Sequence, residues 1–344
     1  MIIPPGVTIY CARVRVPPSC IMRVRLIDID NKYREPRRRG HRFPNLALMK
    51  WSAYYKARGD LVAFDLPDPD ITVMACVFPR NYPHALREAT LATTPLTWGG
   101  TGIPLTDQYR GLPEPIEILK PDYDLYRAIY PSSPFCNSTM GFTSRGCIRD
   151  CEFCIVRQKE GAFRRHQAIA DFHDPRHKIV TLLDNNILAD RDWFFEQTDW
   201  CIDRRLQLNI SQGMDIRLLT PEIAAQLKRI RFVDGQMRFA WDILAIEPHV
   251  ENGIRMLREA GINVRRNVSF FVLAGYHRPG EDPAPFCQDL YRCNRLHEMG
   301  ARAYVMPYNE EGSPLVRALA RWANRPTLRN TPFWKYDRLP GVES

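Results

Sequence analysis

The sequence predicts an α/β protein in which a small doubly wound, Rossmann-like domain precedes a partial parallel (β/α)6 barrel of the TIM-barrel-like type. Strand-like apolar runs alternate with amphipathic helical runs along most of the chain. In the second half, each strand-to-strand step is long enough for a right-handed helical crossover. A length of 344 residues also suggests about two domains. We expect a front domain at 22–120, a linker at 121–136, the barrel at 137–310, and a C-terminal helix and tail at 311–344.

The front domain is predicted from short apolar strands separated by helical segments. Residues 45–60 (NLALMKWSAYYKARGD) indicate an amphipathic helix, with Asn45 as the N-cap and Gly59 at its end. Residues 83–90 predict a second, shorter helix, and GGTG at 99–102 a turn. The expected strands lie at 24–30, 61–66 and 71–78. Residues 103–136 are rich in proline and acidic side chains, which is typical of a linker on the surface.

The second half repeats the alternation with longer helices. Pro221 suits the first turn of a helix because its missing N–H would have no helical partner there, and Gly261 suits a helix end. The expected strands lie at 139–144, 179–186, 206–212, 237–242, 268–276 and 303–309. The expected helices lie at 192–205, 221–230, 249–260 and 285–299.

The formal net charge of +9 is concentrated near the N-terminus. Residues 1–60 contain thirteen Lys or Arg against four Asp or Glu, and many of the cations lie in 31–44 (NKYREPRRRGHRFP). Such a segment is either a solvated basic loop or a contact for phosphate or nucleic acid. Residues 1–21 carry four prolines and no helical period, so we expect a flexible extension, with Met22 as the true start.

Composition favours a protein of the cytoplasm with no membrane partner. The apolar fraction of 45 % and the charged fraction of 25 % are ordinary for a globular protein. There is no apolar run of membrane-spanning length, and we expect no signal peptide. Three of the ten cysteines fall within eight residues, which in a long chain indicates metal binding in a reducing compartment rather than disulfides.

The cysteine cluster lies in GFTSRGCIRDCEFCIV at 141–156, where Cys147, Cys151 and Cys154 follow the first expected barrel strand. Three thiolates can bind zinc or an iron–sulfur cluster. Structural zinc usually takes four ligands, and no second Cys pair occurs at the required spacing. His166 or His173 could supply a fourth ligand. A four-iron cluster on three cysteines would instead leave one iron open.

The spacing Cys-x3-Cys-x-aromatic-Cys, with Phe153 as the aromatic residue, resembles that of the radical S-adenosylmethionine (SAM) superfamily. The resemblance covers roughly residues 137–310. It implies that Cys147, Cys151 and Cys154 bind a [4Fe–4S] cluster, whose fourth iron chelates SAM. It also implies reductive cleavage of SAM to a 5′-deoxyadenosyl radical that takes a hydrogen atom from a substrate. A one-electron donor such as flavodoxin or ferredoxin would supply the electron.

The resemblance also suggests which other residues would bind the cofactor. Phe153 would lie near the adenine. The family often has Gly-Gly-Glu at the end of the second strand, where this chain has Asp184, Asn185 and Asn186. The third strand offers Asp215 and Arg217, and the fourth offers Asp242 for ribose hydroxyls. Each of these polar residues could equally form a salt bridge or a helix cap.

The front domain resembles the cobalamin-binding domain that precedes many barrels of this superfamily. The Asp-x-His-x-x-Gly string that presents a histidine to cobalt is missing, so we expect cobalamin to be unlikely. Lys32, Arg34 and Arg37–Arg39 could instead contact a substrate, either RNA or a small metabolite or peptide. The competing hypothesis is a non-catalytic zinc- or iron–sulfur-binding module that recognises nucleic acid.

Overall fold

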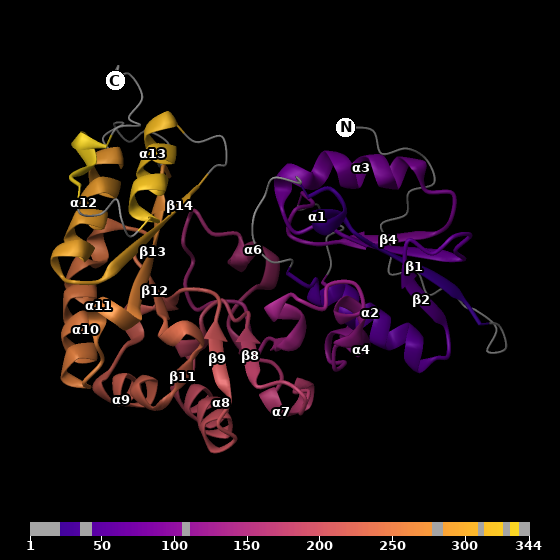
Figure 1. The fold of residues 1–344 in the computed structure, drawn as a ribbon, viewed down its shortest axis with the longest axis horizontal. Coiled ribbons are helices and arrows are strands. Elements are labelled where there is room, and N and C mark those ends of the chain that lie inside the picture. Colours follow the sequence, from indigo (N-terminus) through magenta and orange to yellow (C-terminus); the bar gives the residue numbers. More distant parts are fainter. Residues whose placement is uncertain are drawn as a thin grey trace. The chain divides into compact units, whose positions relative to one another are not determined.

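The computed structural model describes residues 21–34, 43–104, 111–276, 285–308, 313–325 and 331–336. The chain divides into two compact units (Figure 1). Unit 1 comprises Met1–Gly141 and Gln167–Lys178, and unit 2 comprises Phe142–His166 and Ile179–Ser344. Both units are α/β with mostly parallel sheets, as predicted. The expected N-terminal extension and most of the basic 31–44 segment, Arg37–Arg39 included, lie outside the described residues.

Unit 1 is built around a parallel sheet with the strand order β2-β1-β3-β4. The strands of unit 1 are β1 (Arg23–Asp28), β2 (Leu61–Phe64), β3 (Ile71–Ala75), β4 (Leu96–Gly99) and the short β5 (Thr139–Gly141), which is not part of this sheet. Its helices are α1 (Ile29–Lys32), α2 (Leu46–Ala57), α3 (Tyr82–Leu91), α4 (Glu114–Glu117), α5 (Asp124–Arg127) and α7 (Ile169–Phe172). The predicted cap of α2 is confirmed, because the side chain of Asn45 accepts from Leu48 N at 3.2 Å.

Helices cover both faces of this sheet because its strands are apolar on both sides. Val24, Leu26 and Val73 face α2, while Ile27 and Met74 face α3. Figure 1 shows α2 and α4 on one side of the strands and α3 on the other. Two apolar cores therefore form, one on each face.

The proline-rich segment predicted to be a surface linker contributes to the core on the α2 face. Ile116, Tyr123, Leu125 and Tyr126 are all buried there. Tyr126 also donates its phenolic proton to Asp28 at the end of β1. The prolines break this segment into short turns, but its apolar side chains still cover the sheet.

Unit 2 contains longer helices alternating with short strands. Its strands are β6 (Ser144–Arg145), β7 (Arg164–Arg165), β8 (Ile179–Leu182), β9 (Gln207–Ile210), β10 (Met214–Asp215), β11 (Arg231–Phe232), β12 (Met237–Ala240), β13 (Val268–Ala274) and β14 (Arg302–Pro307). Its helices are α6 (Val156–Glu160), α8 (Arg191–Asp203), α9 (Pro221–Arg229), α10 (Glu247–Glu259), α11 (Val264–Asn267), α12 (Pro285–Glu298) and α13 (Pro314–Ala323). One parallel sheet has the order β10-β12-β13-β14, and a second contains β11-β9-β8.

The helix boundaries of unit 2 follow local chemistry. Thr220 caps α9 by accepting from Ile223 N at 3.3 Å, and Pro221 occupies the first turn as predicted. Gly261 ends α10 with a φ of 75°, a conformation that glycine adopts without strain. Within the described residues, no helix is both long and apolar enough to cross a bilayer.

The sheet β10-β12-β13-β14 has two different faces. Phe239, Phe270 and Val305 are buried on the face packed against helices, where α12 and α13 contact β13 and β14. The opposite face, which we call the open face, carries Arg238, Ala240, Ser269, Phe271, Leu273, Arg302, Tyr304 and Met306. Tyr304 is 49 % exposed and Met306 46 % exposed, so unit 2 leaves this face partly uncovered.

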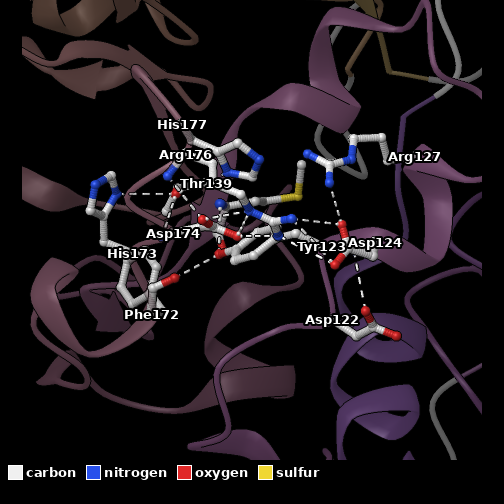
Figure 2. Close-up of polar contacts among 11 residues, drawn as sticks. Asp122, Tyr123, Asp124, Arg127, Thr139, Phe172, His173, Asp174, Arg176 and His177 are labelled. Carbon is white, nitrogen blue, oxygen red and sulfur yellow. Dashed lines mark hydrogen bonds and ion pairs between the residues drawn. The ribbon is translucent and has the colours of Figure 1, made fainter.

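Unit 1 contains a buried polar network around Thr139, shown in Figure 2. Thr139 Oγ1 accepts from Asp174 N at 3.1 Å and lies 3.2 Å from His173 Nδ1 and 3.3 Å from His177 Nδ1. A hydroxyl can donate only one proton, so one histidine must donate to it and the other must accept. His177 is 2 % exposed and its Nε2 has no partner among the described residues. This favours Nδ1–H on His177, because a bare buried acceptor costs less than a bare donor.

His177 should make the stability of the protein depend on pH near neutrality. Burial lowers the pKa of His177, as do the charges of Arg176, Arg127 and His173, while Asp174 opposes them. Below pH 6.5 the unfolded chain therefore binds the proton more readily, and stability is lost as pH falls. We expect the free energy of unfolding to fall by up to about 1.4 kcal/mol per pH unit below 6.5. Urea unfolding measured across pH 5–8 tests this.

The His177→Gln variant should lose that part of the pH dependence, whereas His249→Gln, at an exposed position on α10, should retain it. Equal pH dependence in H177Q and the unmodified protein would contradict the assignment. The lowered pKa of Asp174, caused mainly by the hydrogen bond from Arg176, acts in a separate range below about pH 4, where stability is lost as the carboxylate protonates.

Candidate functional site

The three clustered cysteines lie in unit 2, in the loop that joins β6 to α6. Cys147, Cys151 and Cys154 are free thiols and each is partly exposed. Gly146 precedes the first of them with a φ of 73°, and a Cβ there would lie 2.2 Å from Ala162 O. A side chain at this position would therefore push the loop away from Ala162. Gly146 therefore determines the path of the backbone at the start of the cysteine loop.

The three thiols lie near enough to one another for their charges to interact. Burial raises the pKa of Cys151, and Cys154 and Cys147 raise it further, while the nearby Arg217 lowers it. Burial likewise raises the pKa of Cys154, with a further contribution from Cys147. The neighbouring thiolates thus disfavour ionisation of Cys151 and Cys154, and a bound cation would relieve this repulsion.

Three thiols in one loop are donors of the kind that iron–sulfur clusters take. Among the described residues, no three His, Cys, Asp or Glu side chains are grouped closely enough to hold one metal ion. Ligands of a cluster bind different irons and so stand further apart than ligands of a single ion. Asn186 adds a second observation: it is 3 % exposed, its Nδ2 lies 3.6 Å from Cys147 Sγ, and its buried Oδ1 has no partner among the described residues.

Asp184 holds the chain that leads into the cysteine loop. Its carboxylate is 1 % exposed and accepts from both backbone and hydroxyl groups of Thr143 and Ser144. The distances are 3.1 Å to Thr143 N and 2.6 Å to each hydroxyl. Burial raises the pKa of Asp184, and these hydrogen bonds oppose that shift. Both oxygens therefore point at the loop entrance in this structure.

Asn185 and Glu160 fix the first cysteine from the other side. Glu160 Oε2, at the end of α6, accepts from Gly146 N at 3.0 Å and from Asn185 Nδ2 at 2.9 Å. Arg145 forms an ion pair with the same carboxylate at 3.4 Å. The Asn185 side chain is thereby engaged with a residue of the loop.

Asp215 connects the cysteine loop to β10. It is 8 % exposed and accepts from Arg149 Nε at 2.9 Å and from Arg217 at 2.6 Å (Nε) and 3.0 Å (Nη2). Burial would raise the pKa of Asp215, but the two guanidinium groups outweigh it and hold the pKa below its usual value. Arg149 lies between Cys147 and Cys151 in sequence, so this ion pair fixes the centre of the loop.

Asp242 lies close to the thiols without a salt bridge among the described residues. Its charge raises the pKa values of Cys151 and Cys154. Burial raises the pKa of Asp242 itself, opposed chiefly by Arg292. One carboxylate oxygen accepts from Leu273 N at 3.2 Å. Arg292 donates to Trp241 O and Leu273 O, at 2.5 and 2.7 Å, and so holds the ends of β12 and β13 together beside Asp242.

Phe153 belongs to a row of aromatic rings at the same end of the strands. Its ring centroid lies 5.6 Å from that of Tyr276, which follows β13, in an edge-on arrangement. Tyr276 in turn lies 4.9 Å from Tyr308, after β14. Neighbouring rings in this row are inclined by 68° and 72°, so the row presents both ring faces and ring edges beside the cysteine loop.

Sequence reasoning identified the cysteines and the acidic residues around them but missed several of their partners. Arg149 and Glu160 interact with the loop and were not predicted as site residues, whereas Asn186 was predicted with Asp184 and Asn185 as a possible cofactor contact. Arg149 and Glu160 stand within or just beyond the cysteine motif, which is the signal that could have drawn attention to them. His173, considered as a fourth zinc ligand, instead contacts Thr139 in unit 1.

No family model matches the chain, and no curated protein matches it. Among solved structures, the chain is similar to the radical S-adenosylmethionine methyltransferase TsrM from Kitasatospora setae, determined with cobalamin and a [4Fe–4S] cluster bound. The likeness covers 84 % of this chain and 75 % of that chain, with a TM-score of 0.56 and 14 % sequence identity. At this identity the likeness concerns the fold.

Removing the carboxylate of Asp184 should strongly destabilise unit 2. In Asp184→Ala, buried donors of Thr143 and Ser144 lose their acceptor, which we expect to lower the free energy of unfolding by about 3 kcal/mol. Urea unfolding followed by tryptophan fluorescence measures this. Asp192→Ala is the matched control, because that carboxylate is 77 % exposed and should change stability little. A D184A protein as stable as D192A would contradict the conclusion that Asp184 holds Thr143 and Ser144 in place.

Proposed function

We propose that this chain is a radical SAM enzyme that binds a [4Fe–4S] cluster through Cys147, Cys151 and Cys154. The observation that carries the proposal is the grouping of three free thiols in one loop, with Asn186 Nδ2 3.6 Å from Cys147 Sγ and its buried Oδ1 unpartnered among the described residues. When bound, such a cluster supplies one electron that cleaves SAM to methionine and a 5′-deoxyadenosyl radical, which abstracts hydrogen from a substrate. The fold shared with TsrM supports the same proposal.

Some side chains around the cysteine loop hold it in position, and others could bind the cofactor. Asp184 and Asn185 are engaged with the loop, so we assign them to positioning the cysteines rather than to direct cofactor contact. Asp215 does the same through Arg149. Asn186 Nδ2 donates toward Cys147 Sγ. Hydrogen bonds to ligand sulfurs change the reduction potential of an iron–sulfur cluster.

The remaining polar groups suit the cofactor. Asn186 Oδ1 is a buried acceptor for an ammonium group, and Arg217, 23 % exposed, can still offer a guanidinium edge to a carboxylate. Asp242 has one oxygen on Leu273 N and can accept from ribose hydroxyls with the other. Phe153 and Tyr276 offer faces and edges to a flat adenine.

The proposal requires a reductant and a substrate. A one-electron donor such as flavodoxin or ferredoxin would reduce the cluster. The substrate is a nucleic acid or a small metabolite or peptide, and the basic 31–44 segment, which would favour RNA, lies mostly outside the described residues. Catalysis of this kind belongs to a reducing compartment, which agrees with free cysteines throughout the described chain.

The direct test is product formation by the protein purified without oxygen and reconstituted with iron and sulfide. Addition of dithionite and SAM should yield 5′-deoxyadenosine, detected by chromatography and mass spectrometry. Cys151→Ala should lose most of its iron and form no product, because two thiolates hold the cluster poorly. Cys287→Ala, at an exposed thiol on α12, should keep both. Full iron content in C151A, or no 5′-deoxyadenosine from an iron-loaded protein, would refute the proposal.

We further propose that unit 1 does not bind cobalamin. The residue two positions after Asp28 is Asp30, whose carboxylate accepts from Val77 N at 2.6 Å, Phe78 N at 3.2 Å and Asn81 Nδ2 at 2.8 Å. This side chain therefore ties the end of β1 to the end of β3, where a cobalt-binding histidine would otherwise project.

Incubation with hydroxocobalamin followed by gel filtration should leave no cobalamin absorbance with the protein. Retention of about one equivalent would overturn this point and would align the chain with the cobalamin-containing TsrM. The result is independent of the cluster, since it can be read with no iron present.

A further inference from the structure

A belt of polar side chains crosses the strands of unit 2 at one level, away from the cysteine loop. Strand register places Arg238, Ser269 and Arg302 side by side on β12, β13 and β14, all on the open face. Arg238 Nη1 donates to Asn209 Oδ1 on β9 at 3.3 Å, and Asn209 pairs in register with Thr181 on β8. We call these five residues the polar belt.

The polar belt has more donors than its own members use. Neither Arg238 nor Arg302 forms an ion pair within the described part of the chain, although each is partly buried. Thr181 is 1 % exposed and its hydroxyl has no hydrogen-bond partner among the described residues. Burial lowers the pKa of Arg238, and Asp234 and Tyr304 offset this only in part. Two cations and a bare buried hydroxyl at one level call for an anion.

The next level of the open face is apolar. Ala240, Phe271 and Tyr304 stand side by side in register, two residues beyond the belt on their strands. Phe271 and Tyr304 form an edge-on pair with centroids 5.8 Å apart, and Tyr304 is 49 % exposed. Gly213 approaches Phe271 and Ala240 so closely that a Cβ on it would lie 3.0 Å from the phenyl ring. The Gly213 backbone thus packs against one side of the Phe271 ring, while Tyr304 remains half exposed.

We propose that the polar belt binds the carboxylate of an aromatic substrate whose ring lies against Phe271 and Tyr304. Two residues along a strand span about 6.6 Å, which matches a carboxylate joined to a ring by two or three carbons. Asp242 follows the end of β12, four residues after Arg238 in the sequence. The far end of such a molecule therefore extends toward Asp242 and the thiols next to it.

This inference names a substrate class for the proposed function but can be tested without it. The probes are 3-phenylpropionate and its neutral counterpart 3-phenylpropanol, titrated calorimetrically into the full-length protein with no SAM or reductant. The acid should bind, and the alcohol should bind at least about tenfold more weakly, because a charge-assisted pair with arginine contributes at least about 1.5 kcal/mol. Propionate, which lacks the ring, should also bind more weakly than 3-phenylpropionate.

Substitutions separate the belt from general effects of charge. Arg302→Met removes a side chain with no hydrogen bond or ion pair among the described residues, so it should fold normally and weaken binding of the acid about tenfold. Arg238→Lys should keep more affinity than Arg238→Met, since it keeps the charge. Arg265→Met, at an exposed position on α11, is the control and should bind the acid normally.

Equal affinity for the acid and the alcohol, no measurable binding of the acid up to its solubility limit, or unchanged binding in R302M would each overturn the inference. The two proposals fail in different ways. If the protein forms 5′-deoxyadenosine but does not bind 3-phenylpropionate, the proposed reaction stands and the proposed substrate class is refuted. If the protein binds the acid but never forms 5′-deoxyadenosine, the aromatic carboxylate site stands and the proposed reaction is refuted.

Discussion

The buried carboxylate of Asp184 is the constraint on which the cysteine site depends. It follows β8 and accepts four hydrogen bonds from Thr143 and Ser144, the residues that precede the cysteine loop. A buried carboxylate is costly unless such donors surround it, so this segment can adopt few other positions. Glu160 and Asp215 act in the same way further along the loop. Acidic side chains near the thiols therefore serve largely to place them.

This arrangement leaves a short set of groups free for chemistry at the same end of the strands. Asn186 Oδ1 has no partner among the described residues, Asp242 accepts from Leu273 N through one oxygen, and the rings of Phe153, Tyr276 and Tyr308 contact one another in a row. The polar belt lies lower on the open face and is separated from these groups by an apolar level. The proposed cluster site therefore lies beyond the end of β12, and the proposed anion-binding level lies on β12 itself.

Much of the fold could be predicted because its strands and helices carry strong patterns. β1, β3 and β13 are apolar runs, and α2 and α9 begin at Asn45 and Thr220–Pro221, which are recognisable start signals. The short strands β4 and β10 were missed because two to four residues give no period, and β4 ends in the glycines that were read as a turn. The segment 112–130 was read as a surface linker because its prolines and acidic residues hide the apolar positions that pack on α2.

The site was only partly predictable for a similar reason. Three cysteines at short spacing can be recognised in the sequence alone. The partners of Asp184 and Asp215 cannot, because they depend on which strand ends lie next to each other in the fold. A carboxylate at the end of a strand could contact a cofactor or hold a loop, and the sequence cannot distinguish these roles. The structure separates them through contacts: Asp184 is fully engaged, while Asn186, its neighbour but one, retains an unpaired oxygen.

The central claim is that the three thiols hold an iron–sulfur cluster with one iron open to SAM. Electron paramagnetic resonance of the reconstituted, dithionite-reduced protein tests it most directly. The account predicts a reduced-cluster signal whose g-values shift when SAM is added, and little or no such signal in the C151A variant, which should hold little iron. A signal that ignores SAM, or a protein that binds zinc in place of iron and gives no signal, would contradict it.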